Sequence, residues 1–184
     1  MSKDTVFSGR VWVLAEGGHL IEDIDTDQIY HNAHLHITDI GEMGQYALGN
    51  LKGWEDFFSM AEPGDILAAG RNFGAGSSRQ QAVDCFRALG VAAILAPSFG
   101  AIYFRNAVNS GFPLLRCFEL SDWIQDGTLE NGDRIEIDLR TGKGKNITKG
   151  SVFETEGMSR VQVAVYETGG LFAYGKAIES DGVK

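Results

Sequence analysis

Cysteine, basic residues and long apolar runs are all scarce in this sequence. The two cysteines, Cys85 and Cys117, lack Cys-x-x-Cys spacing and are typical of reduced core side chains rather than of a disulfide framework. Lys and Arg number 16 against 25 Asp and Glu, and the net charge of −9 argues against a nucleic-acid or anionic-membrane surface. No apolar run approaches the roughly 18 residues of a membrane span, and no secretory signal opens the sequence, so we expect a cytoplasmic protein.

The length and the spacing of apolar segments predict the architecture. The 184 residues suit a single domain over 1–184, in which about 172–184 form a polar and mobile tail. Short apolar runs predict strands over 6–14, 65–70, 91–96 and 112–117. Helices are expected after the second and third of these strands, and this alternation is typical of a doubly wound α/β sheet. The later part adds a half-exposed strand, a β-hairpin and a helix, over 132–139, 146–153 and 159–168.

The sequence is organised around the glycine-rich stretch that follows the second expected strand. Gly74 and Gly76 permit positive φ angles and a close backbone approach, and Ser77 or Ser78 is a suitable N-cap for the next helix. Arg79 adds a planar, bidentate donor in the expected first turn, where a cation opposes the helix dipole unless an anion binds beside it. The stretch therefore predicts a carboxylate or phosphate site. The alternative is an ordinary glycine-rich turn with a serine cap.

An earlier polar stretch carries clustered carboxylates and imidazoles. Asp25 and Asp27 lie in an acidic run that is typical of a solvated turn. His31, His34 and His36 follow it, but their spacing fits no standard metal site, so we expect no metal ligand among them.

Three motifs in a fixed order resemble a known family. They are Asp25-Thr26-Asp27, the run Asn-Phe-Gly-Ala-Gly-Ser-Ser-Arg at 72–79, and the run Ala-Pro-Ser-Phe-Gly-Ala-Ile-Tyr-Phe-Arg-Asn-Ala at 96–107. In these motifs the chain resembles the small subunits of isopropylmalate dehydratase and homoaconitase, the swivelling domain of the aconitase superfamily. The resemblance implies an α/β fold, namely a single swivelling β/β/α domain as in the aconitase C-terminal domain.

The resemblance also implies an activity and a partner. Such enzymes are hydro-lyases that isomerise a hydroxy di- or tricarboxylate, of the 3-isopropylmalate type in leucine biosynthesis, by dehydration and rehydration. They use a 4Fe-4S cluster held by three cysteine thiolates, which the two separated cysteines here cannot supply. The implied cluster therefore belongs to a large subunit, with which this chain would form a heterodimer and without which it would be inactive.

Individual residues take roles from the same resemblance. By motif position Ser77 matches the catalytic base, and Ser78 and Arg79 match a clamp for substrate carboxylates. The segment His34-Leu35-His36-Ile37 lies where related subunits cover the variable group of the substrate. Supporting positions are implied at Asp27, Gly74, Gly76 and Arg105.

The chain departs from the family pattern near the proposed base. Ala75 replaces a usual Cys, Gln80 and Gln81 replace a Glu-His pair, and Ala101 stands where an Arg is usual. No Lys or Arg occurs between residues 28 and 51, although isopropylmalate versions often carry an arginine there. These departures keep two alternatives open. One is a related hydro-lyase for another substituted malate or for homocitrate or citrate, and the other is a non-catalytic anion-binding module of the same fold.

Overall fold

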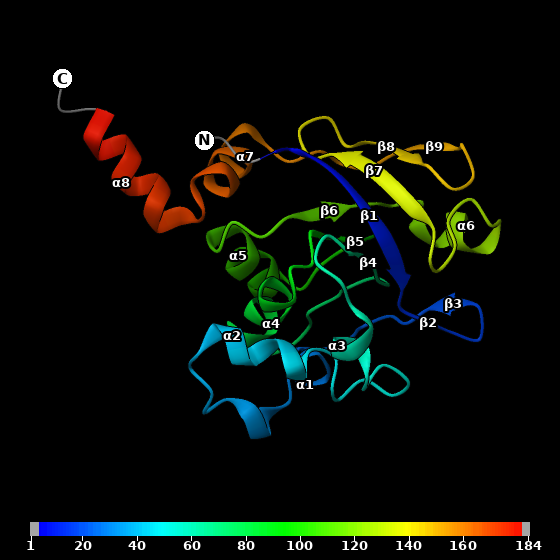
Figure 1. Ribbon diagram of the computed structural model, residues 1–184, viewed down its shortest axis with the longest axis horizontal. Coiled ribbons are helices and arrows are strands. Elements are labelled where there is room, and N and C mark those ends of the chain that lie inside the picture. Colours follow the sequence, from blue (N-terminus) through cyan, green and yellow to red (C-terminus); the bar gives the residue numbers. More distant parts are fainter. Residues whose placement is uncertain (1–3, 182–184) are drawn as a thin grey trace.

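The computed structural model describes residues 4–181, which form a seven-stranded mixed sheet and a small two-stranded ribbon (Figure 1). The strand order in the large sheet is β6-β5-β4-β1-β7-β8-β9. The parallel part consists of β1 (Val6–Val13), β4 (Ile66–Ala68), β5 (Ala93–Ala96) and β6 (Leu114–Arg116). The antiparallel part consists of β7 (Arg134–Asp138), β8 (Lys143–Asn146) and β9 (Val152–Glu154). The ribbon pairs β2 (Ala15–Glu16) with β3 (His19–Leu20).

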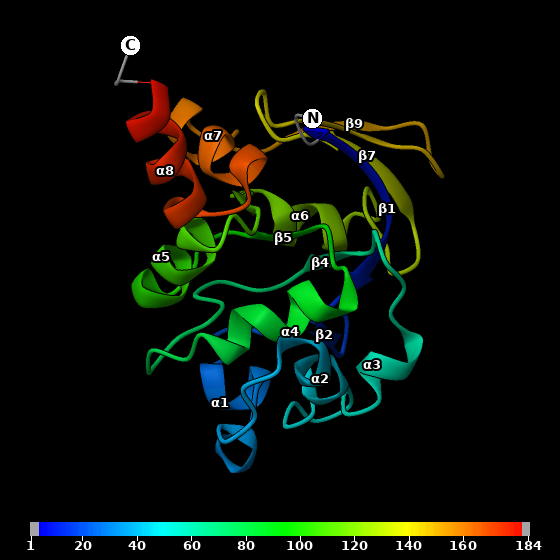
Figure 2. The same cartoon turned by 60° about the vertical axis from the view of Figure 1, so that its left-hand side comes forward.

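Helices cover both faces of the large sheet (Figure 2). One face carries α1 (Thr26–Ile29), α2 (Ile40–Met43), α3 (Phe57–Met60), α4 (Gln81–Leu89) and α5 (Ala101–Asn109), with the 3₁₀ turns η1 (Asn32–His34) and η2 (Gly44–Tyr46). The other face carries α6 (Leu120–Gln125) and α7 (Arg160–Thr168). The result is the mixed α/β fold that the sequence predicts.

The order of the parallel strands explains why α4 and α5 share a face. From β1 through β4 and β5 to β6 the chain steps across the sheet in one direction, and right-handed crossovers then place each connecting helix on the same side. Phe86 of α4 and Tyr103 of α5 accordingly join one apolar cluster with Leu67. The doubly wound arrangement expected for these helices is therefore wrong. Leu120 of α6 and Val163 of α7 pack in a second cluster on the opposite face.

The predicted β-hairpin exists, but its first strand lies earlier in the chain than expected. This strand, β8, ends at Asn146, whereas we expected it to begin there. The Asn146 side chain is fully buried and donates hydrogen bonds to Asp133 Oδ2 at 2.7 Å and to the Thr128 carbonyl at 3.0 Å. These contacts with the preceding loop fix the end of the strand, and they are not visible in the local sequence.

The C-terminal segment also differs from the expected polar, mobile tail. The helix expected over 159–168 is present as α7 (Arg160–Thr168), which Ser159 caps and Gly169 ends with a φ of 90°. Residues 172–181 of the predicted tail lie in α8 (Leu171–Asp181), while 182–184 lie outside the described residues. This helix contacts α7 and α5 and projects from the body of the molecule (Figure 1). Within residues 4–181, none of the helices has the length and apolar character needed to cross a bilayer.

Candidate active site

Three loops meet beyond the carboxyl ends of the parallel strands, where α/β sheets usually bind ligands. The glycine-rich loop after β4 lies between the loop that precedes α1 and the loop that follows β5. Gly74 N donates to the Ile24 carbonyl at 2.8 Å, Thr26 N donates to the Ala75 carbonyl at 2.9 Å, and Gly100 N donates to the Phe73 carbonyl at 2.9 Å. Backbone contacts between distant segments therefore determine the path of the glycine-rich loop.

The two glycines of this loop adopt the positive φ angles that the sequence predicts. Gly74 has a φ of 78° and Gly76 a φ of 89°. At Gly74 a Cβ atom would also lie 2.2 Å from the Tyr103 ring, so a side chain does not fit there. Gly100 faces the same loop, and its Cβ would lie 2.3 Å from the Gly74 carbonyl oxygen. Because Gly74 and Gly100 have no side chains, the glycine-rich loop and the start of α5 can approach each other closely, and this contact bounds the site on the α5 side.

Neither serine caps α4, so that part of the prediction is wrong. The helix begins at Gln81, and its N-cap residue Gln80 makes no side-chain capping bond. Because the Ser77 carbonyl accepts a hydrogen bond from Thr26 Oγ1 at 3.0 Å, the chain stays in an irregular loop up to the helix. The Ser77 side chain is exposed, and its hydroxyl bonds to no residue among 4–181. The Ser78 hydroxyl accepts from Asn106 Nδ2 at 3.2 Å.

The backbone of this loop presents a row of donors. The five consecutive N–H groups of residues 76–80 donate to no acceptor within the described part of the chain. Successive backbone N–H groups in a turn form a concave site that favours anions. The anion site stays a prediction, and the backbone donors available to it are loop N–H groups rather than those of a serine-capped helix.

Arg79 lies two residues before α4 and is held by the segment around α1. Its Nη1 atom donates to Asp27 Oδ1 at 2.5 Å and to the Tyr30 carbonyl at 2.9 Å. Only 15% of the Arg79 side chain is exposed. Its Nε and Nη2 atoms make no hydrogen bond to another described residue, and they remain available to a carboxylate. We expected a bound anion to compensate the charge of Arg79, but the carboxylate of Asp27 already compensates part of it.

Asp27 is the centre of a small polar network. Besides Arg79, its carboxylate accepts hydrogen bonds from Asn32 N and Asn50 Nδ2, each at 3.1 Å. The hydrogen bond from Arg79 is the largest influence on the pKa of Asp27 and lowers it, with a smaller contribution from the Asn32 N–H. Asp27 is therefore charged near neutral pH and orients the Arg79 guanidinium. Asp25 has a separate role, because its side chain caps α1 through the N–H groups of Asp27 and Gln28.

The segment at 34–37 divides into anchored and exposed side chains. His34 stacks on Tyr46 with ring centroids 3.9 Å apart, and Ile37 packs against the apolar cluster that includes residues of α4 and α5. Burial is the main cause that lowers the pKa of His34. Leu35 and His36 are exposed, and the His36 ring bonds to a backbone carbonyl within the same loop. Only Leu35 and His36 thus face outward from this segment.

Of the departures from the family pattern, the two glutamines make hydrogen bonds in this chain. Gln80 Nε2 donates to Ser110 Oγ at 2.8 Å and to Asp84 Oδ1 at 3.2 Å. Gln81 Nε2 donates to the Leu35 carbonyl at 3.4 Å and so links α4 to the segment at 34–37. Ala101 is exposed at the start of α5.

Some residues at this site carried no signal in the sequence, and one predicted residue lies apart. Asn50 and Asn106 reach Asp27 and Ser78 only through the tertiary fold, so local patterns could not identify them. Arg105 is exposed on α5 and makes no hydrogen bond or ion pair within residues 4–181. Its supporting role therefore stays a prediction.

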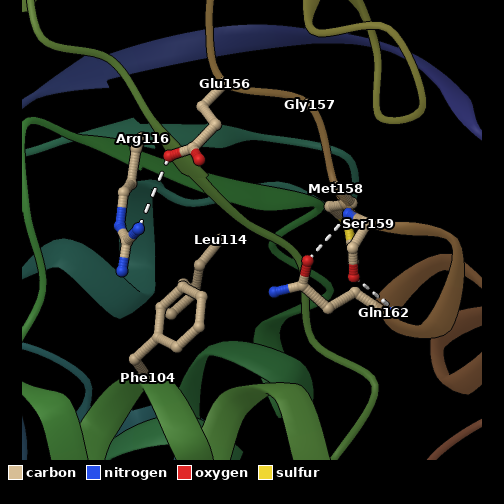
Figure 3. Close-up of a pocket in the computed structure, with 8 residues that line it drawn as sticks. All are labelled: Phe104, Leu114, Arg116, Glu156, Gly157, Met158, Ser159 and Gln162. Carbon is tan, nitrogen blue, oxygen red and sulfur yellow. Dashed lines mark hydrogen bonds and ion pairs between the residues drawn. The ribbon is translucent and has the colours of Figure 1, made fainter.

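A well-formed cavity of about 250 Å³ lies elsewhere, between α5, β6 and α7 (Figure 3). Arg116 lies over the Phe104 ring at 5.0 Å and pairs with Glu156 at 3.5 Å. Since neither Ser77 nor Arg79 lines this cavity, we do not assign it to the candidate active site.

Comparison with known proteins agrees with these observations. Residues 54–117 match the Aconitase C-terminal domain family. The chain is 38% identical to the 3-isopropylmalate dehydratase small subunit of Caldicellulosiruptor bescii, over 84% of this chain and 89% of that protein. It is 34% identical to the methanogen homoaconitase small subunit of Methanothermobacter thermautotrophicus, over 90% and 88% of the two chains.

A solved structure extends the agreement to the fold. The crystal structure of a 3-isopropylmalate dehydratase from Methanocaldococcus jannaschii superposes with a TM-score of 0.83 at 29% identity, covering 97% of this chain and 98% of that one. The similarity includes the glycine-rich loop, α4 and α5, which lie within the matched domain. The chain therefore belongs to the family of small subunits of 3-isopropylmalate dehydratase and homoaconitase, within the aconitase superfamily.

Proposed function

We propose that this chain supplies a serine base and an arginine clamp to a two-subunit hydro-lyase that isomerises a hydroxy dicarboxylate of the 3-isopropylmalate type. The observation that carries the proposal is an exposed Ser77 hydroxyl two residues before Arg79, whose guanidinium is oriented by Asp27. Both lie on a loop whose backbone N–H groups at 76–80 have no acceptor among the described residues. This arrangement favours a ligand that carries carboxylates.

Ser77 would remove the proton from the carbon next to the hydroxyl-bearing carbon. A serine accepts this proton only as the alkoxide, so Oγ must first release its own proton to water. Nearby donors must then stabilise the negative charge on Oγ and, after the transfer, on the substrate. The N–H groups at 76–80 and the Arg79 guanidinium are such donors. Ser78 would add a hydroxyl to the clamp, with Asn106 holding its orientation.

The iron–sulfur cluster of the family does not fit the cysteines of this chain. Cys85 on α4 is fully buried and Cys117 is 1% exposed. Cys117 directly follows β6 and packs in the apolar cluster on the opposite face of the sheet from Cys85. Burial raises the pKa of each thiol, which disfavours the thiolate that a cluster needs. We therefore place the 4Fe-4S cluster on the large subunit, the partner that the name "small subunit" implies.

The segment at 34–37 would select the substrate. His34 and Ile37 anchor it, so the exposed Leu35 and His36 would meet the variable group of the substrate. An apolar Leu35 suits a branched aliphatic group. Another substituted malate, or homocitrate or citrate, remains the alternative, since the exposed His36 offers a polar contact.

The decisive experiment compares variants of the assembled enzyme. The chain is co-expressed with the candidate large subunit from the same organism, the cluster is reconstituted anaerobically, and hydroxy di- and tricarboxylates are screened by absorbance of the unsaturated intermediate. Ser77→Ala should lower kcat by about 10²–10⁴-fold, the range for acid–base groups, with little change in binding. Arg79→Lys keeps the charge but loses the planar fork, so KM should rise.

The matched control is Ser59→Ala, which removes an exposed serine hydroxyl from α3. This variant should retain wild-type kcat and KM. If Ser77→Ala lost thermal stability but kept near-normal turnover, Ser77 would be structural and the catalytic assignment would be wrong. An assembled enzyme that binds the acids without turnover would support a non-catalytic anion-binding module instead.

A further inference from the structure

The cavity between α5, β6 and α7 combines an apolar floor with a charged mouth (Figure 3). Leu114 and Met158 are buried, and with the half-buried Phe104 ring they form the floor. Arg116 and Glu156 form the mouth, where their side chains are 44% and 54% exposed. The volume of about 250 Å³ lies below the roughly 300–1,000 Å³ of sites for drug-sized ligands. The cavity therefore suits a small molecule with one apolar and one charged end.

The backbone holds the two charged residues of the mouth side by side. Glu156 N donates to the Arg116 carbonyl at 2.7 Å, and this antiparallel bridge joins the segment after β9 to the edge strand β6. The Arg116 Nη1 and Glu156 Oε2 atoms lie 3.5 Å apart, and the Arg116 guanidinium lies over the Phe104 ring at 5.0 Å. Exposed ion pairs contribute little to stability, so stability alone does not account for this arrangement.

Several polar atoms at the mouth have no hydrogen-bond partner among the described residues. Arg116 contacts Glu156 through Nη1, while its Nε and Nη2 atoms make no hydrogen bond within residues 4–181. Gln162 Oε1 accepts from Ser159 N at 2.8 Å, and this contact turns Gln162 Nε2 toward the cavity (Figure 3). Arg116 and Gln162 thus offer unused donors beside the Glu156 carboxylate, whose Oε1 atom is likewise unused by the described residues.

We propose that this cavity binds a free α-amino acid with an apolar side chain. An α-amino acid carries a carboxylate and an ammonium group on one carbon atom, and the mouth presents a cation and an anion 3.5 Å apart to match them. The ligand carboxylate accepts hydrogen bonds from Arg116 and Gln162, and its ammonium group donates to Glu156. The ligand side chain lies on the apolar floor, where burial of apolar surface stabilises the complex.

The paired charges also exclude simpler ligands. A monocarboxylate would bring a like charge next to Glu156, and a monoamine would bring one next to Arg116. Juxtaposed like charges suppress the binding of wrong partners, so both kinds of molecule should bind more weakly than the amino acid with the same apolar group.

The test is calorimetric titration of the full chain with L-leucine, L-methionine and L-phenylalanine. The matched control ligands are 4-methylpentanoate and 3-methylbutylamine, which are leucine without its ammonium group and leucine without its carboxylate. At least one of the three amino acids should bind with a Kd of about 1 mM or tighter. Both control ligands should bind at least about tenfold more weakly than leucine, because each lacks one charge-assisted contact.

Variants of the mouth locate the binding site. Arg116→Gln and Glu156→Gln should each weaken binding about tenfold or more, with wild-type melting temperatures because both side chains are exposed. The matched control is Arg71→Gln. Arg71 is also an exposed arginine paired with a glutamate, Glu22, at 2.8 Å, but it does not line the cavity, so its variant should bind within about twofold of the wild type. If Arg116→Gln were unstable, the affinity of Glu156→Gln would decide alone.

Three results would overturn the assignment. The first is the absence of binding of all three amino acids up to about 10 mM. The second is binding of 4-methylpentanoate as tight as that of leucine, which would make the cavity a simple anion site. The third is wild-type affinity in both mouth variants, which would place the amino acid elsewhere. Because neither Ser77 nor Arg79 lines the cavity and the titration needs no large subunit, each of these results would leave the proposed function standing.

Discussion

Replacing Asp27 by asparagine tests whether this carboxylate positions Arg79 for the substrate. The change keeps the size of the side chain and one oxygen acceptor, but it removes the charge that the Arg79 Nη1 atom meets at 2.5 Å. A charge-assisted hydrogen bond contributes about 1.5–3 kcal/mol and a neutral one about 0.5–1.5 kcal/mol. Since the Asp27 side chain is 34% exposed, solvent screening places the expected loss near the lower end of that difference, at about 1 kcal/mol.

A loss of about 1 kcal/mol corresponds to a roughly fivefold change in an equilibrium constant. Asp27→Asn should therefore raise the KM of the assembled enzyme about fivefold and change kcat little, because Arg79 would contact the substrate equally in the ground and transition states. Steady-state kinetics with reconstituted cluster measures both constants. The Tyr30 carbonyl still holds Arg79 Nη1 at 2.9 Å, so the guanidinium is loosened rather than released.

The control for this experiment is Glu22→Gln. Glu22 pairs with Arg71 at 2.8 Å on the same side of the molecule, but the Glu22 and Arg71 side chains are 47% and 64% exposed and neither contacts Arg79. Exposed pairs of this kind contribute about 0–1 kcal/mol, and we expect KM to remain at the wild-type value. A lower KM in Asp27→Asn would refute the reasoning, since it would mean that Asp27 competes with the substrate for Arg79.

Three further predictions concern stability, selectivity and the cluster. Asp65 is 3% exposed and binds Arg10 at 2.8 Å, so Asp65→Asn should lower the free energy of unfolding by about 3 kcal/mol in urea titrations at neutral pH. Burial acts to raise the pKa of Asp65, but hydrogen bonds led by the one from Arg10 outweigh it and lower the pKa below the ordinary 3.8. The stabilisation by ionised Asp65 is therefore full above that pH and should disappear only in stronger acid. A wild-type advantage in stability that is already lost near neutrality would contradict this. Exchanging residues 34–37 for the segment of a homoaconitase small subunit should change the ranking of substrates by kcat/KM, and an unchanged ranking would refute the specificity role. The chain purified alone should show no iron–sulfur absorbance, because Cys85 on α4 and Cys117 after β6 are both buried, and a visible cluster band would overturn the placement of the cluster on the partner.

The sequence alone was sufficient for much of the fold. Apolar runs predicted β1, β4, β5 and β6, because short buried strands need little more than a continuous apolar segment. The expected helix over 159–168 corresponds to α7, whose ends follow the local signals of the N-cap Ser159 and of Gly169. The three motifs also identified the family, which the comparisons confirm.

Where local sequence signals conflict with contacts between distant segments, the tertiary structure determined the conformation. Ser77 and Ser78 satisfy the sequence rule for a helix cap, yet hydrogen bonds from residues 24–26 hold the loop in an irregular path until Gln81. The polar composition of the last segment predicted a tail, but packing against α5 and α7 supports α8 as a helix.

The candidate site shows the same division between sequence and tertiary structure. The resemblance of the sequence motifs to the family singled out Ser77, Arg79 and Asp27, because those motifs are continuous in the chain. Only the fold showed that Arg79 reaches Asp27 across the site, that Asn50 donates to Asp27, and that Asn106 donates to Ser78. The physical reason is that a side chain's hydrogen-bond partner depends on which segments the sheet brings together, and this information is spread over the whole chain.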